Sequence, residues 1–224
     1  MRYLKSFQIF ESKSVDEIQK FKKEYGTELD SEFTTNQIKL IRSAFSHFEK
    51  KFIKNKIKKI ILKDLGGVHG RWTETKKKKE MTINPSIFDF VKKFKLTDTK
   101  EVDYTDFILV HEIGHCFDHW SKISYSKKWQ AISGWKKCDI DEKIPEGYKR
   151  YIEKRRGREI AGHKKSDWVY KEGSDFCRKY SSRNPREDFA DSFAFAVFGG
   201  TDKFKGEGGK KKLQIVQELL SEIA

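Results

Sequence analysis

The stretch from Asp106 to Trp120 contains the pattern His-Glu-x-x-His, formed by His111, Glu112 and His115. In a helix, residues four apart lie one turn above each other, so the two imidazoles can bind one zinc ion. The glutamate beside them can act as the base for a water bound to that ion. The pattern therefore predicts half of a catalytic zinc site, and the third ligand has to come from another region of the chain.

Glu187 is the best candidate for the third ligand. It begins the pattern Glu-x-x-x-Asp, which places Glu187 and Asp191 on one face of a second predicted helix. Two histidines and one glutamate leave the fourth position of a tetrahedral zinc ion for water. Asp191 can accept the ring N–H of a ligating histidine and hold its tautomer. The alternative is structural, because with Asn184 as the N-cap Glu187 falls at N3 and can close a capping box.

Other histidines and carboxylates are weaker candidates for ligands. His119 continues the four-residue spacing, but it lies about 12 Å along the helix axis from His111, too far to share one ion. Asp118 is interpreted as a residue that supports the site or caps a nearby loop. The histidines interpreted as surface, core or loop residues are His47, His69 and His163.

The two motifs together resemble the gluzincin metallopeptidases, which pair His-Glu-x-x-His with a downstream Glu-x-x-x-Asp. More narrowly, residues 111–118 and 180–194 are similar to the catalytic-domain family of anthrax lethal factor, which includes the Pro-Pro endopeptidases. That family carries a tyrosine seven residues before the glutamate ligand, where it stabilises the oxyanion. Tyr180 occupies this place relative to Glu187.

The resemblance implies a zinc endopeptidase with a zincin-like fold and one Zn²⁺ ion on His111, His115 and Glu187. Glu112 is expected to take the proton of the attacking water and pass it to the leaving amine. Tyr180 is expected to stabilise the oxyanion. The substrate is expected to be a protein or peptide, with acidic sequences favoured by the basic surface, extended along the edge of a small sheet.

Two alternatives stay open. The ImmA/IrrE type of cytosolic zinc peptidase also has His-Glu-x-x-His and a later Glu-x-x-Ala-like helix, and it fits the spacing of Tyr180 less well. A basic nucleic-acid-binding or structural protein with a vestigial zinc site is supported by the net charge of +14 and by the basic runs 76–79 and 149–156. Glu112 favours the enzyme, because a structural zinc site needs no glutamate there.

The composition is that of a folded protein of a reducing compartment. Its 224 residues suit one domain, and 18 Phe, 8 Tyr and 5 Trp argue against disorder despite 37% charged residues. The cysteines Cys116, Cys138 and Cys177 are odd in number and have no disulfide-framework spacing. With no signal-peptide pattern and no apolar run of membrane length, we expect a cytoplasmic protein, in a host cell if phage-encoded, with non-classical secretion as the other route.

The expected fold is α+β and predominantly helical, with a small sheet beside the motif helix. It is expected to form a single domain over 1–224, comprising an N-terminal helical region over residues 1–55, a catalytic core over 56–200 with a basic insertion over 121–180, and a C-terminal helix over 201–224. Apolar and punctuating residues predict helices, besides the motif helix, over 15–25, 35–54, 86–94, 127–135, 148–156, 186–198 and 210–222. A strand is expected over 57–63, followed by a hairpin with Lys76 to Lys79 at its tip.

Overall fold

The fold is described from a computed structural model of the whole chain. The described residues are 2–66, 68–75, 78–89, 92–152, 154–155, 158–159 and 166–223. Side chains are described for all of these except 2–13, 154–155 and 158–159. Of the residues singled out above, Lys76, Lys77, Arg156 and His163 lie outside the described residues.

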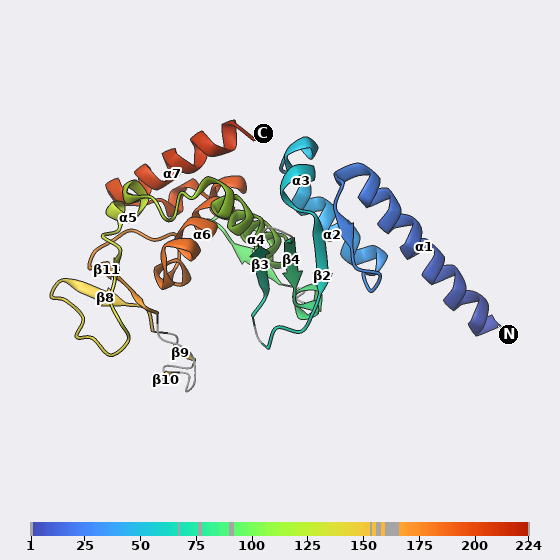
Figure 1. Cartoon of the computed structure of the whole chain (residues 1–224), viewed down its shortest axis with the longest axis horizontal. Helices are drawn as coiled ribbons and strands as arrows, with labels where there is room; N and C mark the ends of the chain where they lie inside the picture. Colours follow the sequence, from blue (N-terminus) through green and yellow to red (C-terminus); the bar gives the residue numbers. More distant parts are fainter. Residues whose placement is uncertain are drawn as a thin grey trace. The chain divides into compact units, whose positions relative to one another are not determined.

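The structure is mixed α/β, with about 50% of it helical and with small sheets, as the residue pattern predicted in outline (Figure 1). The chain forms two compact units. The first comprises Met1–Lys95, Glu101–Cys116 and Glu222–Ala224, and the second comprises Leu96–Lys100 and Phe117–Ser221. Their boundary falls inside α4 (Tyr104–Ser121), the motif helix. The zincin-like identity of the fold and the single domain stay predictions.

A four-stranded sheet is the main β structure of the first unit. Its strand order is β1-β2-β4-β3, with β2 parallel to β1 and β4, and β3 antiparallel to β4. The predicted strand and hairpin are confirmed, and Lys79 already belongs to a strand. The strands are β1 (Glu28–Leu29), β2 (Lys59–Leu62), β3 (Gly70–Glu74) and β4 (Lys79–Ile83).

Three helices accompany this sheet, namely α1 (Arg2–Tyr25), α2 (Thr35–Phe45) and α3 (Lys50–Lys56). The prediction of one helix over 35–54 is wrong, because the chain leaves the helix at Ser46. The Ser46 hydroxyl donates to the Ser43 carbonyl at 2.6 Å, a local bond that competes with helix propagation. Apolar spacing alone did not reveal this break, because Phe45 and Phe48 are buried on both sides of it.

The helix predicted over 86–94 is also wrong. In the described part of this stretch, which leaves out residues 90 and 91, the chain forms a short 3₁₀ turn, η1 (Pro85–Asp89), and then β5 (Lys93–Lys95). Strand β5 pairs antiparallel with β6 (Glu101–Asp103), and the Phe94 ring stacks on Phe107 of α4 at 4.0 Å between centroids. These tertiary partners stabilise the extended conformation of β5. Local propensity does not predict this strand, because it contains no information about such partners.

The second unit contains a three-stranded antiparallel sheet in the order β7-β11-β8. The basic stretch that begins at Tyr148 was predicted to be helical, and this prediction is wrong for its described residues. Residues 148–150 instead pair with 169–171 of β11. The strands are β7 (Lys136–Lys137), β8 (Tyr148–Arg150) and β11 (Trp168–Lys171), with a further pair β9 (Lys154–Arg155) and β10 (Arg158–Glu159).

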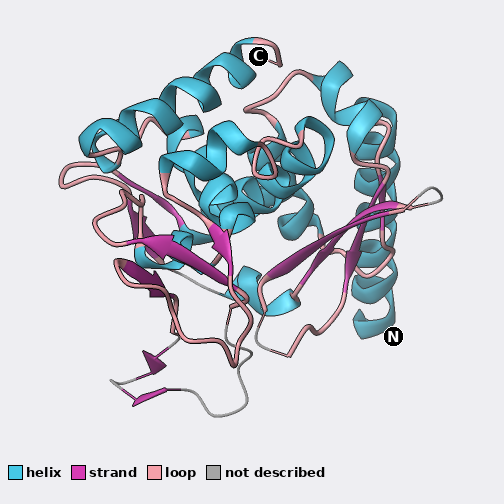
Figure 2. Ribbon diagram, turned by 60° about the vertical axis from the view of Figure 1, so that its left-hand side comes forward, coloured by secondary structure: helices cyan, strands magenta, loops and turns pink. Residues whose placement is uncertain are grey.

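The second unit also contains helices, drawn in cyan in Figure 2 like those of the first unit, and aromatic side chains pack in its core. Phe193 stacks on Phe117, and Trp129 packs edge-on against Phe189. The helix predicted to begin after Asn184 is confirmed, and the other two are present with different ends. The helices are α5 (Lys127–Ile132), α6 (Pro185–Val197) and α7 (Gly206–Ser221), with 3₁₀ turns η2 (Lys179–Arg183) and η3 (Thr201–Lys203).

Candidate metal centre

Helix α4 presents the motif because its opposite face is apolar. Leu109, Val110, Ile113 and Phe117 are all buried, as the 3.6-residue period predicts. Trp120, which the same spacing would place on this buried face, departs from the pattern and is 44% exposed. It lies in the last turn of the helix.

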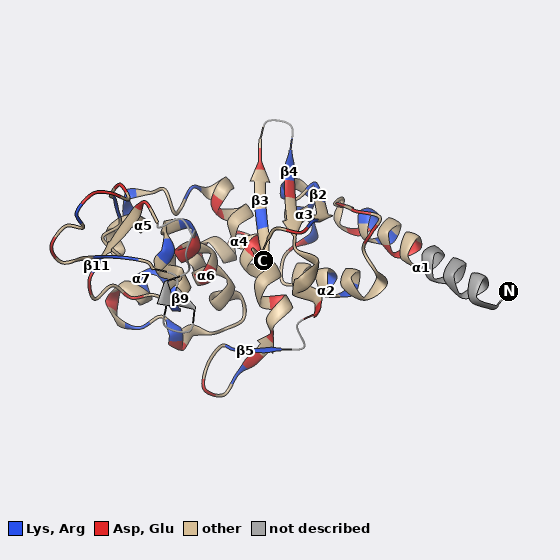
Figure 3. Cartoon of the chain, turned by 90° about the horizontal axis from the view of Figure 1, so that it is seen from below, with Lys and Arg blue, Asp and Glu red and all other residues tan. Residues whose placement is uncertain are grey.

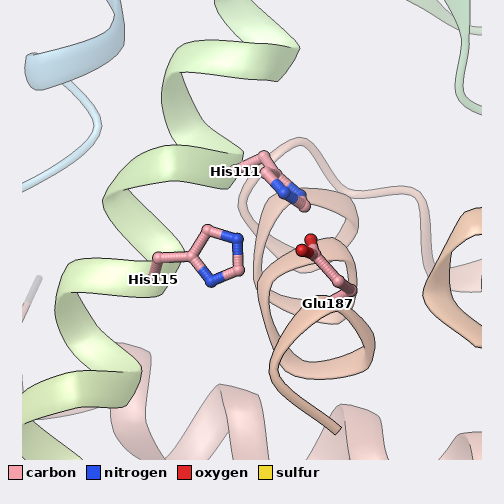
Figure 4. A group of neighbouring side chains, drawn as sticks. All are labelled: His111, His115 and Glu187. Atoms are coloured by element: carbon pink, nitrogen blue, oxygen red, sulfur yellow. The ribbon is translucent and has the colours of Figure 1, made fainter. Parts of the chain in front are cut away.

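The three predicted ligands meet in the structure. Ligand atoms of His111, His115 and Glu187 all lie within 4.8 Å of one another. Figure 4 shows the two imidazoles, one turn apart on α4, directed toward the carboxylate on α6. Both histidines are buried, and Glu187 is partly exposed. Within the described residues this is the metal-ligand group that forms, and it is compatible with one metal ion.

The donor set fits a divalent transition metal. Two imidazoles and one carboxylate are ligands that zinc takes in catalytic sites, at about 2.0–2.2 Å from the ion. In a tetrahedral arrangement such ligand atoms are separated by about 3.5 Å, which lies within the limit of 4.8 Å that contains all three ligand atoms here. The same donors also suit iron, so the geometry alone does not identify the metal.

The start of α6 forms as the residue types predicted. Asn184 is the N-cap, and its side-chain oxygen accepts the backbone N–H of Arg186 and of Glu187, each at 3.0 Å. Pro185 follows at the first helical position, where its missing N–H costs nothing. The cap uses the backbone of Glu187, while its carboxylate is directed to the two imidazoles. Capping and ligation are therefore compatible here.

Glu112 lies against the backbone of β3. A Cβ added to Gly70 would come within 2.4–2.6 Å of the Cδ, Cγ and Oε1 atoms of Glu112. The Glu112 side chain is itself buried, so only glycine allows this close approach. The sequence analysis did not predict this contact, for which a glycine at the start of a strand was the available signal.

Tyr180 is held in η2 between two arginines. The Arg183 guanidinium donates to the Tyr180 hydroxyl at 3.1 Å, and the guanidinium carbons of Arg178 and Arg183 lie 5.1 and 5.6 Å from its ring centroid. Burial raises the pKa of the phenol well above its usual range, and the Glu187 carboxylate raises it further. Tyr180 therefore stays protonated and can donate a hydrogen bond near the candidate ligand Glu187.

Asp191 is completely buried one turn after Glu187. It accepts two bonds from the Arg178 guanidinium, at 2.9 and 2.6 Å, and one from the Ser181 hydroxyl at 2.7 Å. These bonds tie η2 to α6, and the residue pattern did not predict them. The bond from a ligating histidine to Asp191 stays a prediction.

Asp118 caps the loop that follows α4. Its carboxylate accepts from the backbone N–H and the hydroxyl of Ser124, at 2.8 and 2.6 Å, and Arg186 lies 3.9 Å away. This is the loop-capping role that was one of its two predicted roles. Of the other histidines, His47 is exposed, and His69 makes a 3.2 Å hydrogen bond with the Tyr104 hydroxyl.

No family model, no curated protein and no solved structure matches this chain. Among the residues that the structure describes, no helix combines the length and apolar character needed to cross a membrane.

Proposed function

We propose that this protein is a zinc-dependent endopeptidase in which Glu112 is the general base. The observation that supports the proposal is the meeting of His111, His115 and Glu187 within 4.8 Å, with Glu112 next to His111 on the same helix. Three protein ligands with a neighbouring glutamate are typical of catalytic zinc sites, whereas structural sites use four protein ligands.

Each residue of the site has its own role in the proposed reaction. His111, His115 and Glu187 would hold the zinc ion, which when bound would lower the pKa of water to about 7 and polarise the scissile carbonyl. Glu112 accepts the proton of the attacking water and donates it to the leaving amine. The Gly70 backbone restricts the Glu112 carboxylate on one side, which limits its rotamers and keeps it available for both transfers.

Tyr180 is the proposed oxyanion donor. Its hydroxyl accepts from Arg183, so its own proton is available for donation to a developing negative charge. A donor that is neutral and already oriented costs little reorganisation when the charge forms. One such donor is worth about 3–4 kcal/mol of transition-state stabilisation.

The proposed substrate is an extended peptide beside β3. This strand is the last in the order β1-β2-β4-β3, so among the described strands it pairs on one side only. A peptide can add to such an edge through main-chain hydrogen bonds. Because Gly70 of β3 contacts Glu112, a peptide bound there would lie beside the general base. The net charge of +14 favours acidic peptides.

Metal analysis and a peptide library test the proposal. Protein reconstituted with zinc is expected to hold close to one equivalent and to cleave internal peptide bonds. Chelation is expected to abolish cleavage and added zinc to restore it. Clearly substoichiometric zinc, or cleavage that persists after complete chelation, would contradict the proposal. Because the same three ligands suit zinc and iron, comparing zinc with ferrous iron in the same assay shows which metal supports cleavage.

A nucleic-acid-binding or structural protein is the rival from another class, and its support is the basic composition. Figure 3 shows lysine and arginine along many elements, interspersed with acidic residues. The runs on which the rival depends are partly paired, because Lys79 lies 3.6 Å from Glu74 and Lys149 contacts Glu172. Salt-dependent DNA binding that survives removal of zinc would favour the rival.

A further inference from the structure

Three consecutive residues at the start of α6 are directed to three different partners. Successive side chains of a helix diverge by about 100°, so neighbours in sequence cannot share one partner easily. Arg186 lies 3.9 Å from the Asp118 carboxylate of α4. Glu187 is the candidate metal ligand. Asp188 bonds to Lys212 of α7 at 2.9 Å.

The Asp188–Lys212 pair is completely enclosed. The side chains of the two residues are 0% and 1% exposed, respectively. The Lys212 ammonium also donates to the Asp175 carbonyl at 2.6 Å, and it lies 4.4 Å from the ring centroid of Phe176. The Trp135 indole N–H donates to the other oxygen of Asp188 at 3.2 Å. Both oxygens of this carboxylate are therefore held, by donors from two different segments.

Stability alone does not explain such a cluster. A buried ion pair gains little over apolar residues of similar volume, because both charges lose their hydration. The pair fixes the rotation of α6 about its own axis. Apolar packing tolerates a small rotation of a helix, whereas a carboxylate that is hydrogen-bonded at both oxygens does not. Since Asp188 follows Glu187 directly, a rotation of α6 that is prevented at Asp188 is also prevented at Glu187.

We propose that Asp188, Lys212 and Trp135 form a positioning cluster that sets the orientation of Glu187 for metal binding. These residues do not touch the metal or the substrate. They act through the backbone of α6. Residues that do not bind a metal ion can still orient the side chains that do. The inference rests on the proposed function in one respect, the use of Glu187 as a metal ligand. It gives α7, which supplies no candidate ligand, a role in the geometry of the candidate metal centre.

The decisive variant removes both charges together, as Asp188→Ala with Lys212→Met, because either single change leaves an uncompensated buried charge. Zinc affinity is measured on the apo-protein by competition with a chromophoric chelator. We expect the dissociation constant for zinc to rise about 10–100-fold. This is the usual loss of metal affinity when a residue that orients a metal ligand is removed. The matched control is Val216→Ala, which truncates a buried residue one turn further along α7.

The control separates positioning from general loosening of the fold. Val216→Ala is expected to lower the melting temperature while changing the zinc dissociation constant less than about threefold. A double variant that binds zinc as tightly as the wild type overturns the proposal, and so does a control with an equal loss of affinity. If the double variant does not fold, the Trp135→Phe variant tests the positioning cluster in its place. It removes one donor to Asp188 and keeps the aromatic ring, so weaker zinc binding supports the proposal and unchanged binding overturns it.

The outcomes also separate this inference from the proposed function. A wild-type protein that does not bind zinc contradicts the peptidase proposal before the variants are compared. A wild-type protein that binds zinc and cleaves peptides, with a double variant of equal zinc affinity, leaves the peptidase proposal standing and overturns only the positioning cluster.

Discussion

Helix α4 carries two of the candidate metal ligands opposite a buried apolar face, whereas α6 carries the third candidate next to charged residues that bond to other segments. Leu109 and Ile113 of α4 are at most 1% exposed. On α6, Asp188 bonds to Lys212, and Asp191 bonds to Arg178 through both of its oxygens. Apolar burial stabilises a helix without fixing its rotation, and hydrogen bonds to charged groups fix a direction. Substitutions of the buried apolar residues of α4 should therefore change mainly stability, and those of the charged residues beside Glu187 mainly metal binding.

The largest expected effect comes from Glu112→Gln on α4. The amide cannot accept the proton of the attacking water, so turnover should fall by about 10²–10⁴-fold, up to ~5.4 kcal/mol in activation free energy. Glu112 is not a proposed ligand, so zinc content should not change. Peptide cleavage rates and metal analysis of the same preparation check both expectations. Unchanged cleavage would rule out Glu112 as the base.

Leu109→Ala tests the apolar side of the comparison. The residue is buried on the face of α4 away from the histidines, and we expect a loss of about 2–5 kcal/mol in the free energy of unfolding. The zinc dissociation constant of the folded protein should change little, because no polar contact of the ligands is removed. Chemical denaturation and chelator competition provide the two measurements. A large loss of zinc affinity would mean that α4 also depends on precise packing to orient its ligands.

Tyr180→Phe should reduce turnover by about 10²–10³-fold, which corresponds to the loss of one oxyanion donor. Zinc content should stay intact, since the hydroxyl is not a proposed ligand. Tyr25→Phe, at a buried tyrosine of α1, is a suitable control and should leave cleavage unchanged. Loss of zinc in Tyr180→Phe would show that its role is misassigned. Unchanged turnover would favour the ImmA/IrrE-like alternative, which fits this tyrosine less well.

Asn184→Ala is the mildest change and concerns only the start of α6. Loss of the bonds to the N–H groups of Arg186 and Glu187 should lower the free energy of unfolding by about 1 kcal/mol. Zinc affinity should fall as well, because the fraying turn carries the ligand. Ser126→Ala removes the N-cap of α5, where the side chain accepts from the Trp129 N–H. It should cost similar stability without the loss of zinc affinity.

The features predicted from sequence are those that depend on residues close together in the chain. The four-residue step from His111 to His115 requires only a helix, and its apolar residues predict one. Asn184 and Pro185 predict the start of α6 in the same local way, because a cap bonds to groups two and three residues away. Glu187 was found because the chemistry of the first motif requires a third ligand.

Long-range pairing decided the rest. Residues 148–150 favour a helix locally, but they pair with residues 169–171 as a strand. The local sequence pattern does not identify this partner. The close approach of Gly70 to Glu112 brings together residues 42 positions apart, and Lys212 lies 24 positions from Asp188. Sequence therefore determined which residues are candidates for binding a metal. The tertiary structure decided what holds Glu187 in place, because donors and acceptors far apart in the chain become partners only after folding.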